Sequence, residues 1–371
     1  TGAIYLKSNV NLHIKKNAIL KFSTDKTKYL PLVLTRYEGV ECMNYSPLIY
    51  SYKEKNIAVT GEGILDGQGS NENWWFWKGK EEYGWKAGMP NQDESRNRLF
   101  EWNDKQTPVE ERILGENGYL RPVFIQFYNC ENILISGVKL LNSPMWFLNP
   151  VLSKNISIIG LHIEGLGPNN DGCNPESCEN VLIKDCFFNT GDDCIAIKSG
   201  RNNDGRRIGI PSSNIIVKNC KMEEGHGGIV MGSEISGGVR NVFVEDCEMS
   251  SPNLDRAVRI KTNSCRGGFI ENIFVRNVKV GEVKEAVLKI NFYYEEGDKG
   301  DFTPTAKNIV LENVTSEKSK YAIWVKAYER AKVEGLIIKD SKFNSVESGS
   351  ILEGLNNPKF ENCFINNEIV K

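Results

Sequence analysis

The sequence lacks the features that mark several common classes of protein. Its 371 residues carry 46 Lys and Arg against 48 Asp and Glu, so the net charge is only −2 and no basic field predicts a nucleic-acid partner. No apolar run approaches the length that spans a bilayer, so we expect no membrane partner. No charged-then-apolar leader opens the chain, and the N-terminus therefore carries no signal for a compartment.

Ten cysteines are present, a number that would indicate disulfides in a small secreted protein. A chain of 371 residues, however, can build a hydrophobic core without such bonds. Cys186, Cys220 and Cys247 recur at one position of a repeat, so we expect them to be unbonded and to stack inside the protein as small apolar side chains. Cys173 and Cys178 do not share that position, and their state is left open.

A repeat runs through most of the chain. Its copies begin with an Asn, or once with a Gly, and continue with alternating apolar, mostly β-branched residues; they start at Asn132, Asn155, Asn180, Asn214, Asn241, Asn272, Asn308 and Gly335. Separations of 23 to 36 residues are typical of a solenoid. The fifth residue after each start is Gly, Asp or Asn, which predicts a left-handed turn. Strand-sized segments without amphipathic helices between them predict an all-β parallel solenoid, with coils about 4.8 Å apart.

Two stretches do not follow this rhythm. Residues 70–117 contain five tryptophans among many charges and have no period, which predicts a functional loop or an assembly surface. Arg201 to Pro211 is a basic, Gly-containing segment that we expect to be a loop. The predicted organisation is one domain over residues 1–371 with a Trp-rich loop insertion at about 70–117.

Polar residues recur at intervals of one coil. Asp171, Asp192 and Asp193 stand in turns rich in Asn and Gly, on either side of an apolar run that is predicted to be a strand. His226 follows Asp193 by 33 residues, and Arg259 follows His226 by 33 residues. Since residues one coil apart lie side by side on a solenoid, these groups are predicted to form a ladder on one face.

The ladder as a whole points to function more strongly than any member does. A single Asp in such a turn is more typical of a solvated loop, and a single His is more often structural. Stacked like charges destabilise a fold and raise one another's pKa, and such strain marks functional sites more often than structural ones. Asp192 and Asp193 are neighbours in the sequence, so both can face the site only if the chain bends there. Arg259 and Lys261 point the same way in a predicted strand.

This set of residue types is suited to glycoside hydrolysis. Carboxyl groups one or two coils apart, on the order of 5 to 10 Å, can act as an acid and a base, and the wider part of that range leaves room for a water and predicts inversion. One acid with a raised pKa would protonate the leaving oxygen while ionised acids activate the water. Arg259 and Lys261 can bind an anionic group such as a sugar carboxylate.

Four ordered blocks carry a resemblance to a known family. NNDG at 169–172, GDDCIAIKSG at 191–200, GHGG at 225–228 and RIKT at 259–262 resemble the signature blocks of the polygalacturonases, glycoside hydrolase family 28. The resemblance extends to GEGILDGQG at 61–69 and NSPMWFLNP at 142–150, and so covers nearly the whole chain. It implies a single-stranded, right-handed parallel β-helix that hydrolyses α-1,4-linked galacturonate with inversion, without a metal or another cofactor.

The resemblance also implies roles for individual residues. Asp192 resembles the general acid, Asp171 and Asp193 the pair that holds and activates the water, and His226 the residue that tunes the acid. Substrate binding is implied for Arg259, Lys261, Tyr294 (less closely Tyr293) and Lys198. Segments at 201–207, 233–241 and 251–264 resemble the bacterial exo-acting branch, which implies release of galacturonic acid from the non-reducing end of polygalacturonate or oligogalacturonides, with the Trp-rich insertion as the wall of the groove.

The sequence departs from the family pattern at one turn and at the N-terminal end of the solenoid. Asn170 stands where Thr or Ser is commoner, which we expect to affect turn hydrogen bonds more than chemistry. Relatives carry a segment before the TGAIYL region that caps the helix end, so we expect an N-terminal cap to be missing from this chain. An uncapped solenoid exposes an apolar coil, which leaves a homo-oligomer open as a partner.

Other functions compatible with the same residues stay open. They are endo-acting polygalacturonate hydrolysis, hydrolysis of rhamnogalacturonan or xylogalacturonan, a Ca²⁺-dependent pectate lyase on the same fold, and a non-catalytic carbohydrate-binding β-helix. Retention of Arg259, Lys261 and the His226 block favours galacturonate at the cleavage subsite.

Overall fold

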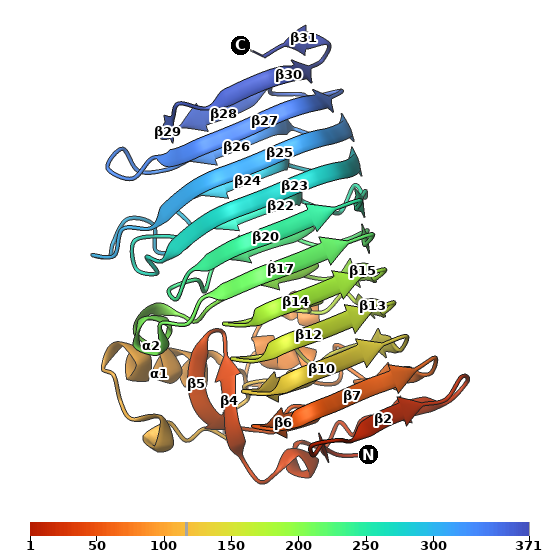
Figure 1. Cartoon of the computed structure of the whole chain (residues 1–371). Coiled ribbons are helices and arrows are strands. Elements are labelled where there is room, and N and C mark those ends of the chain that lie inside the picture. Colours follow the sequence, from red (N-terminus) through yellow and green to blue (C-terminus); the bar gives the residue numbers. More distant parts are fainter. Residues whose placement is uncertain (116–117, 371) are drawn as a thin grey trace.

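The structure, a computed structural model, describes residues 1–115 and 118–370. The chain winds coil upon coil from the N-terminus at one end to the C-terminus at the other (Figure 1). This confirms the predicted all-β class and the single-stranded, right-handed parallel β-helix. In the described part of the chain, no helix has both the length and the apolar character needed to cross a membrane.

The longest sheet has 20 strands, and most coils contribute two consecutive strands to it, joined at a bend. Its strands are β2 (Asn11–Ile14), β3 (Ile19–Lys21), β7 (Lys55–Gly61), β8 (Ile64–Asp66), β10 (Glu131–Ser136), β11 (Lys139–Leu141), β12 (Lys154–Ile159), β13 (His162–Gly165), β14 (Glu179–Lys184), β15 (Phe187–Thr190), β17 (Ser212–Lys218), β18 (Lys221–Met222), β20 (Val239–Glu245), β21 (Glu248–Met249), β23 (Phe269–Glu282), β25 (Thr305–Lys318), β27 (Val333–Phe343), β29 (Leu355–Asn356), β30 (Lys359–Ile365) and β31 (Glu368–Ile369). All its pairings are parallel except that of β30 with β31.

A second side of each coil carries shorter strands. They are β1 (Ile4–Tyr5), β6 (Ile49–Tyr52), β9 (Ile125–Tyr128), β16 (Ile195–Ile197), β19 (Ile229–Gly232), β22 (Arg256–Lys261), β24 (Ala286–Asn291), β26 (Tyr321–Lys326) and β28 (Ser350–Glu353). Isolated bridges through Leu148 and Cys173 connect β9 to β16, so this side is continuous along the solenoid. It is the side on which the predicted ladder lies.

The repeat seen in the sequence has a physical cause in the backbone. Asn180, Asn214 and Asn241 all have φ near +56°, in the left-handed region that Asn tolerates well. Their side chains also form a ladder, in which each amide donates to the carbonyl oxygen of the Asn one coil earlier at 3.0 to 3.1 Å. Gly335 keeps the positive φ (+63°) without a side chain, which explains why the repeat continues there without Asn. The predicted left-handed turn at the fifth position is also confirmed, for example at Asp185 and Asn219.

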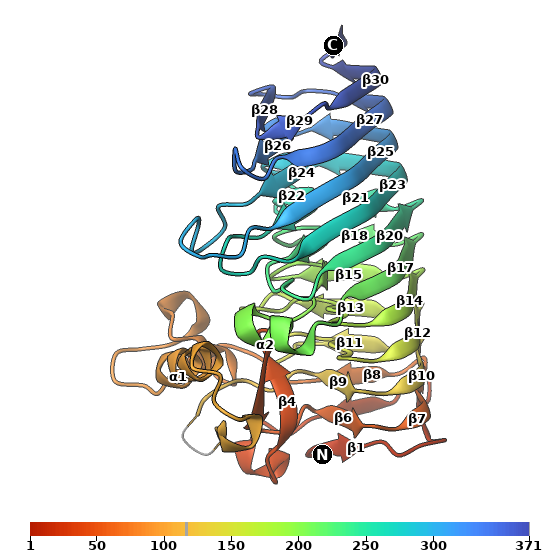
Figure 2. The same ribbon diagram turned by 60° about the vertical axis from the view of Figure 1, so that its left-hand side comes forward.

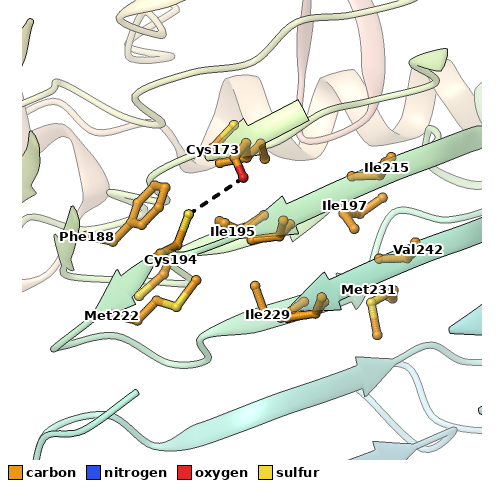
Figure 3. Close-up of a cluster of buried hydrophobic side chains, with 14 of the residues drawn as sticks. Cys173, Phe188, Cys194, Ile195, Ile197, Ile215, Met222, Ile229, Met231 and Val242 are labelled. Atoms are coloured by element: carbon orange, nitrogen blue, oxygen red, sulfur yellow. Dashed lines mark hydrogen bonds between the residues drawn. The ribbon is translucent and has the colours of Figure 1, made fainter. Parts of the chain in front are cut away.

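The core is a column of stacked side chains inside the coils. Figure 3 shows part of it, where Cys173, Phe188, Cys194, Met222 and several Ile side chains pack between the strands. All ten cysteines are free, and nine of them are buried. The expectation of unbonded, buried Cys186, Cys220 and Cys247 is therefore confirmed, and Cys173 and Cys178 are unbonded as well.

Excursions on one side of the solenoid contain helices (Figure 2). The segment predicted as a loop at 201–211 instead forms α2 (Asn202–Ile208), with Asp204 in its first turn, Arg206 and Arg207 in its last, and Gly209 as a left-handed C-cap. The Trp-rich segment contains α1 (Asp93–Asp104) and a 3-10 turn, η2 (Trp75–Lys78), so it is not wholly a loop. Residues 116–117, at the end of that predicted insertion, lie outside the described residues. A hairpin of β4 (Val33–Tyr37) and β5 (Val40–Asn44) lies beside α1 and α2.

Candidate active site

The structure brings the sequence-predicted residues together on the second side of the coils. Asp171 lies in the turn after β13, and Asp192 and Asp193 lie between β15 and β16. One carboxylate oxygen from each of these three acids lies within 4.8 Å of the others. The nearest oxygens are thus closer than the 5 to 10 Å expected from the coil spacing, because the turns carry the acids toward one another. The distance between the carboxyl groups therefore does not show whether the reaction inverts or retains the anomeric configuration.

A turn explains how two neighbouring aspartates face one site. The Asp193 backbone N–H donates to the Asp192 carboxylate at 2.9 Å, and the Thr190 hydroxyl donates to the Asp192 carbonyl at 2.9 Å. These bonds hold the chain in the bend that the sequence required before β16 begins. The two side chains then lie on the same side of the backbone, Asp193 fully buried and Asp192 with 18% of its side chain exposed.

Basic side chains from later coils neutralise the buried acids. Lys261 donates to Asp193 at 2.6 Å, and Arg259 lies 3.5 Å from the other oxygen of the same carboxylate. Both come from β22, where residues two apart share a face. Lys198 lies 3.9 Å from Asp171 and donates to Glu234 at 2.8 Å. The Asp171 carboxylate also accepts a hydrogen bond from Asn174 at 2.9 Å.

His226 is the neighbour of Asp192. It lies between β18 and β19, and its Nδ1 is 3.0 Å from an Asp192 carboxylate oxygen. Its side chain is 54% exposed, so it lies at the mouth of the cluster while Asp171 and Asp193 lie at the bottom. The hydrogen bond to Asp192 and the charge of that carboxylate raise the pKa of His226 to about 9.

The surroundings of Asp171 and Asp192 shift the pKa values of these two acids in opposite directions. Burial raises the pKa of Asp171 well above its ordinary value, and the charge of Asp192 adds to that rise. Burial also acts to raise the pKa of Asp192, but the hydrogen bond from His226 and the charges of His226 and Lys261 outweigh it and hold that pKa below its ordinary value. The sequence had led us to expect a raised pKa on the proton donor, for which Asp192 was the candidate. The structure instead raises the pKa of Asp171, the more deeply buried of these two acids.

Tyr294 is the tyrosine that reaches the cluster. Its ring lies under both cations, 5.3 Å from the Arg259 guanidinium carbon and 5.2 Å from Lys261 Nζ. Tyr293 instead packs edge-on against Tyr328, with ring centroids 4.8 Å apart. Of the two alternatives left by the sequence, the structure places Tyr294 beside the acids.

A cavity of about 230 Å³ lies over the acids and is lined by residues that the repeat does not contain. Glu38 comes from the turn between β4 and β5, Lys78 from η2, Arg96 from α1, and Trp146 from the NSPMWFLNP segment. Lys78 donates to the Asn169 side chain at 3.0 Å, and Arg96 forms an ion pair with Glu38 at 2.6 Å. Sequence reasoning missed Lys78, Glu38 and Arg96, because they lie in segments without periodicity. The only signal was the position of the Trp-rich excursion.

The charges of the acid cluster are balanced by the chain itself. Three carboxylates with oxygens this close form the kind of ligand set that can hold a divalent cation. Here Asp193 has Lys261 and Arg259 as counter-ions and Asp192 has His226, while Lys198 lies 3.9 Å from Asp171 and pairs more closely with Glu234. These cations supply locally the positive charge that a metal ion would otherwise provide.

The fold and the site together define a class of protein: a parallel β-helix with a carboxylate-lined cavity on one side of its coils. Comparison with known proteins gives the family: residues 100–363 match the model of the glycosyl hydrolases family 28, and the chain belongs to this family. It is 46% identical to a hyperthermoactive exopolygalacturonase from Thermotoga maritima, with a TM-score of 0.97, over 100% of this chain and 82% of that one.

Curated relatives are more distant. A probable polygalacturonase from Vitis vinifera is 30% identical over 85% of this chain, and an exo-poly-alpha-D-galacturonosidase from Dickeya chrysanthemi is 24% identical over 97% of it. The chain spans 60% and 66% of the lengths of these two relatives.

Proposed function

We propose that the chain is an exo-acting polygalacturonase, which hydrolyses the terminal α-1,4-galacturonosidic bond from the non-reducing end with inversion and releases galacturonic acid. The observation that carries this proposal is the pairing of one accessible carboxyl, Asp192, with two buried ones that are clamped by cations. The similarity to the exopolygalacturonase of Thermotoga maritima and to the Dickeya chrysanthemi enzyme supports the substrate and the exo mode.

Access decides the roles of the acids, since a proton donor must reach the glycosidic oxygen before its pKa matters. Asp192 is the most exposed of the three carboxyls, with 18% of its side chain accessible against 4% for Asp171 and 1% for Asp193. Asp192 therefore protonates the leaving oxygen. Asp171 and Asp193 hold the attacking water, because they lie deeper in the cluster and the Oδ1 atom of Asp193 has no hydrogen-bond partner and can accept one from water.

Each turnover moves two protons. When water attacks the anomeric carbon, its proton passes to Asp171, the glycosidic C–O bond breaks, and the leaving oxygen takes the proton of Asp192. The raised pKa of Asp171 suits it to accept a proton in this step. The next turnover requires the proton to return to Asp192.

The excursions are proposed to make the enzyme exo-acting, because they close one end of the groove. Glu38, Lys78 and Arg96 all come from segments outside the repeat and line the same cavity as the acids. A wall at this place admits one sugar past the cleaved bond and excludes a continuing polymer. Lys78 supplies a cation there that is bonded to an amide rather than to a carboxylate, and so can bind the carboxylate of the terminal sugar.

Product analysis on polygalacturonate in the presence of EDTA tests the reaction and the mode. We expect monogalacturonate as the only product, first as the β-anomer by NMR. A spread of saturated oligomers would make the enzyme endo-acting, and unsaturated products or inhibition by EDTA would make it a lyase. Cleavage of rhamnogalacturonan or xylogalacturonan alone would change the substrate class, and binding without release of product would make the chain a non-catalytic carbohydrate-binding protein.

An activated leaving group tests the division of roles. Asp192→Asn should lower kcat on digalacturonate by about 10²- to 10⁴-fold, the usual contribution of a general acid. On α-galacturonosyl fluoride, whose leaving group needs little protonation, the same variant should lose much less activity. Asp171→Asn should lose activity on both substrates. The opposite pattern would assign the proton donor to Asp171.

A further inference from the structure

An apolar stripe runs along the outer face of the long sheet, on the side away from α1 (Figure 2). One outward-pointing residue in each of eight successive coils builds it, and strand register places each beside the next: Leu134, Ser157, Leu182, Ile216, Phe243, Phe274, Val310 and Ile337. Seven of these eight side chains are apolar, and Phe243 is 37% and Ile216 41% exposed. In the next coil the register position holds Lys359, an exposed charge that ends the stripe.

Two rows of charged residues flank the stripe. Register aligns the first row as Glu179, Ser213, Arg240, Glu271, Lys307 and Glu334, and the second as Lys184, Lys218, Glu245, Arg276, Glu312 and Lys339. Neighbours within a row also form ion pairs, such as Glu271 with Lys307 and Glu245 with Arg276. Within each of the five coils that supply these pairs (β14, β20, β23, β25 and β27), the residue on one flank is opposite in sign to the residue on the other. In these five coils the two rows are complementary to each other, while the sixth coil, β17, has the neutral Ser213 on one flank and Lys218 on the other.

We propose that this face is the interface of a symmetric dimer, in which the stripes of two copies pack together. A two-fold axis parallel to the solenoid reverses the strand direction and keeps the order of the coils. It therefore places the first charged row of one copy opposite the second row of its partner. Every one of the five charged pairs then meets its opposite sign across the interface, twice in the dimer.

The size of the face limits the strength of the dimer. Eight coils about 4.8 Å apart make the stripe about 35 Å long. Its flanking rows are closer together than the about 17 Å of a straight five-residue span, because a left-handed Asn such as Asn180 stands between the first row and the stripe. The flat area is therefore below about 600 Å², at the small end of specific interfaces, which bury roughly 800 Å² per partner on average. A parallel β-helix has little twist, so two such faces stay in contact over their length (Figure 1).

The same features disfavour a polysaccharide as the occupant. Flanks that carry both signs in balance offer no net attraction to a polyanion. The rings of Phe243 and Phe274 are stacked on each other, with centroids 5.3 Å apart and planes at 13°, and so present their edges rather than open faces for a sugar to stack on. A cavity of about 300 Å³ over Phe243, Phe274 and Val310 can accept apolar side chains from a second copy.

Sedimentation velocity on the full chain at micromolar concentration tests the dimer. The wild type should sediment at twice 41.8 kDa. Phe243→Lys/Phe274→Lys should raise the dissociation constant at least ~100-fold, since four apolar rings leave the interface. Both residues are solvent-facing and lie away from the acid cluster, so hydrolytic activity should be unchanged and will show that the variant is folded.

A charge exchange tests the arrangement. Glu271→Arg places like charges opposite each other twice and should raise the dissociation constant about 10-fold. Glu271→Arg/Arg276→Glu restores opposite signs across the interface if these two positions face each other there. It also breaks the ion pairs of Glu271 with Lys307 and of Arg276 with Glu245 within each chain, so it should recover most, not all, of the affinity lost in Glu271→Arg. A monomeric wild type, a dimer that survives the double Phe substitution, or a charge exchange without recovery would each overturn the proposal. Binding of the wild-type monomer to polygalacturonate through Phe243 would identify the stripe as a polysaccharide surface instead.

Discussion

The bond between His226 and Asp192 makes stability depend on pH. Because this bond raises the pKa of His226 to about 9 from 6.5, its contribution to stability is fully present below pH 6.5 and is lost as the pH rises through about 9. His226→Gln should therefore lower the thermal midpoint at pH 6 and have no such effect at pH 10. The ring is more than half exposed, so solvent screening limits the difference to about 1 kcal/mol or less.

The double variant is the control for this prediction. In an Asp192→Asn background the His226 ring has no carboxylate partner, so the same substitution should have no pH-dependent effect. A pH-dependent loss that persists in that background would mean that other groups, such as Asp255, hold the charge of His226.

Lys78 is expected to determine the affinity for the end of the substrate. Lys78→Met removes a charge-assisted hydrogen bond, an interaction that contributes about 1.5 to 3 kcal/mol, so KM for digalacturonate should rise about 10- to 100-fold. The value of kcat should change little, because the hydrogen bond of Lys78 goes to Asn169 and not to one of the three acids. Lys80→Met is the matched control, since Lys80 lies in the same excursion with an exposed partner, Glu82. Equal effects of both substitutions would show that the excursion, and not this charge, matters.

The site could be predicted from sequence as far as the repeat extends. Asp171, Asp193, His226 and Arg259 are 22 to 33 residues apart, which is one coil each, so periodicity alone places them side by side. Lys78 and Arg96 could not be placed, since segments without a period carry no register. The pKa pattern was also out of reach, because it depends on which acid each cation contacts. His226 pairs with Asp192, while Lys261 pairs with Asp193.

At the scale of elements, the Asn ladder is expected to stabilise the coils. Asn214 donates to Asn180 at 3.1 Å, accepts from Asn241 at 3.0 Å, and has a φ of +57°. Asn214→Ala loses both bonds and strains the backbone, so we expect a destabilisation of about 2 kcal/mol. Asn214→Gly loses only the bonds and should be about half as harmful. Thermal unfolding followed by circular dichroism will give the order of the midpoints, and equal effects would show that backbone strain is not involved.

At Gly335, an Asn can be added to the ladder instead of removed from it. It already has a positive φ, and a Cβ atom placed there would meet the Asn308 backbone at an ordinary contact distance of 3.6 Å. Gly335→Asn should therefore extend the ladder by one bond and also restrict the unfolded chain, raising stability by about 1 kcal/mol. The same thermal unfolding experiment checks it. A lower midpoint would mean that the ladder cannot continue past Asn308.

A buried ion pair ties the excursions to one another. Arg112 donates to Asp204 at 2.7 Å, both side chains are buried, and the Glu41 backbone N–H donates to the same carboxylate at 2.8 Å. Asp204→Ala leaves the Arg112 charge buried without its partner, which typically costs about 3 to 5 kcal/mol. We expect faster proteolysis within residues 70–115 and lower activity, because this segment supplies the cavity wall. Asp298→Asn breaks an exposed pair with Arg330 and should change neither.

The strands were easier to predict than the helices. Alternating apolar residues after each Asn mark the strands of the long sheet. By contrast, α1 is held by ion pairs four residues apart, such as Glu94 with Arg98, on a helix with few apolar residues, so periodicity gave no sign of it. The helix signals of α2 were present in the sequence, as an acid at its start and two arginines and a Gly at its end, but seven residues are too few for a periodic pattern.

At the scale of the whole molecule, the proposed dimer should make stability depend on protein concentration. A partner that binds only the folded chain stabilises it by mass action, so the thermal midpoint of the wild type should rise as the concentration is raised. In Phe243→Lys/Phe274→Lys the stripe no longer pairs, and the midpoint should be independent of concentration. Differential scanning calorimetry over a hundredfold range of concentration, with reversibility checked by a second scan, measures both. A midpoint of the wild type that does not move would mean that each solenoid unfolds alone, and that the stripe contributes nothing to stability in solution.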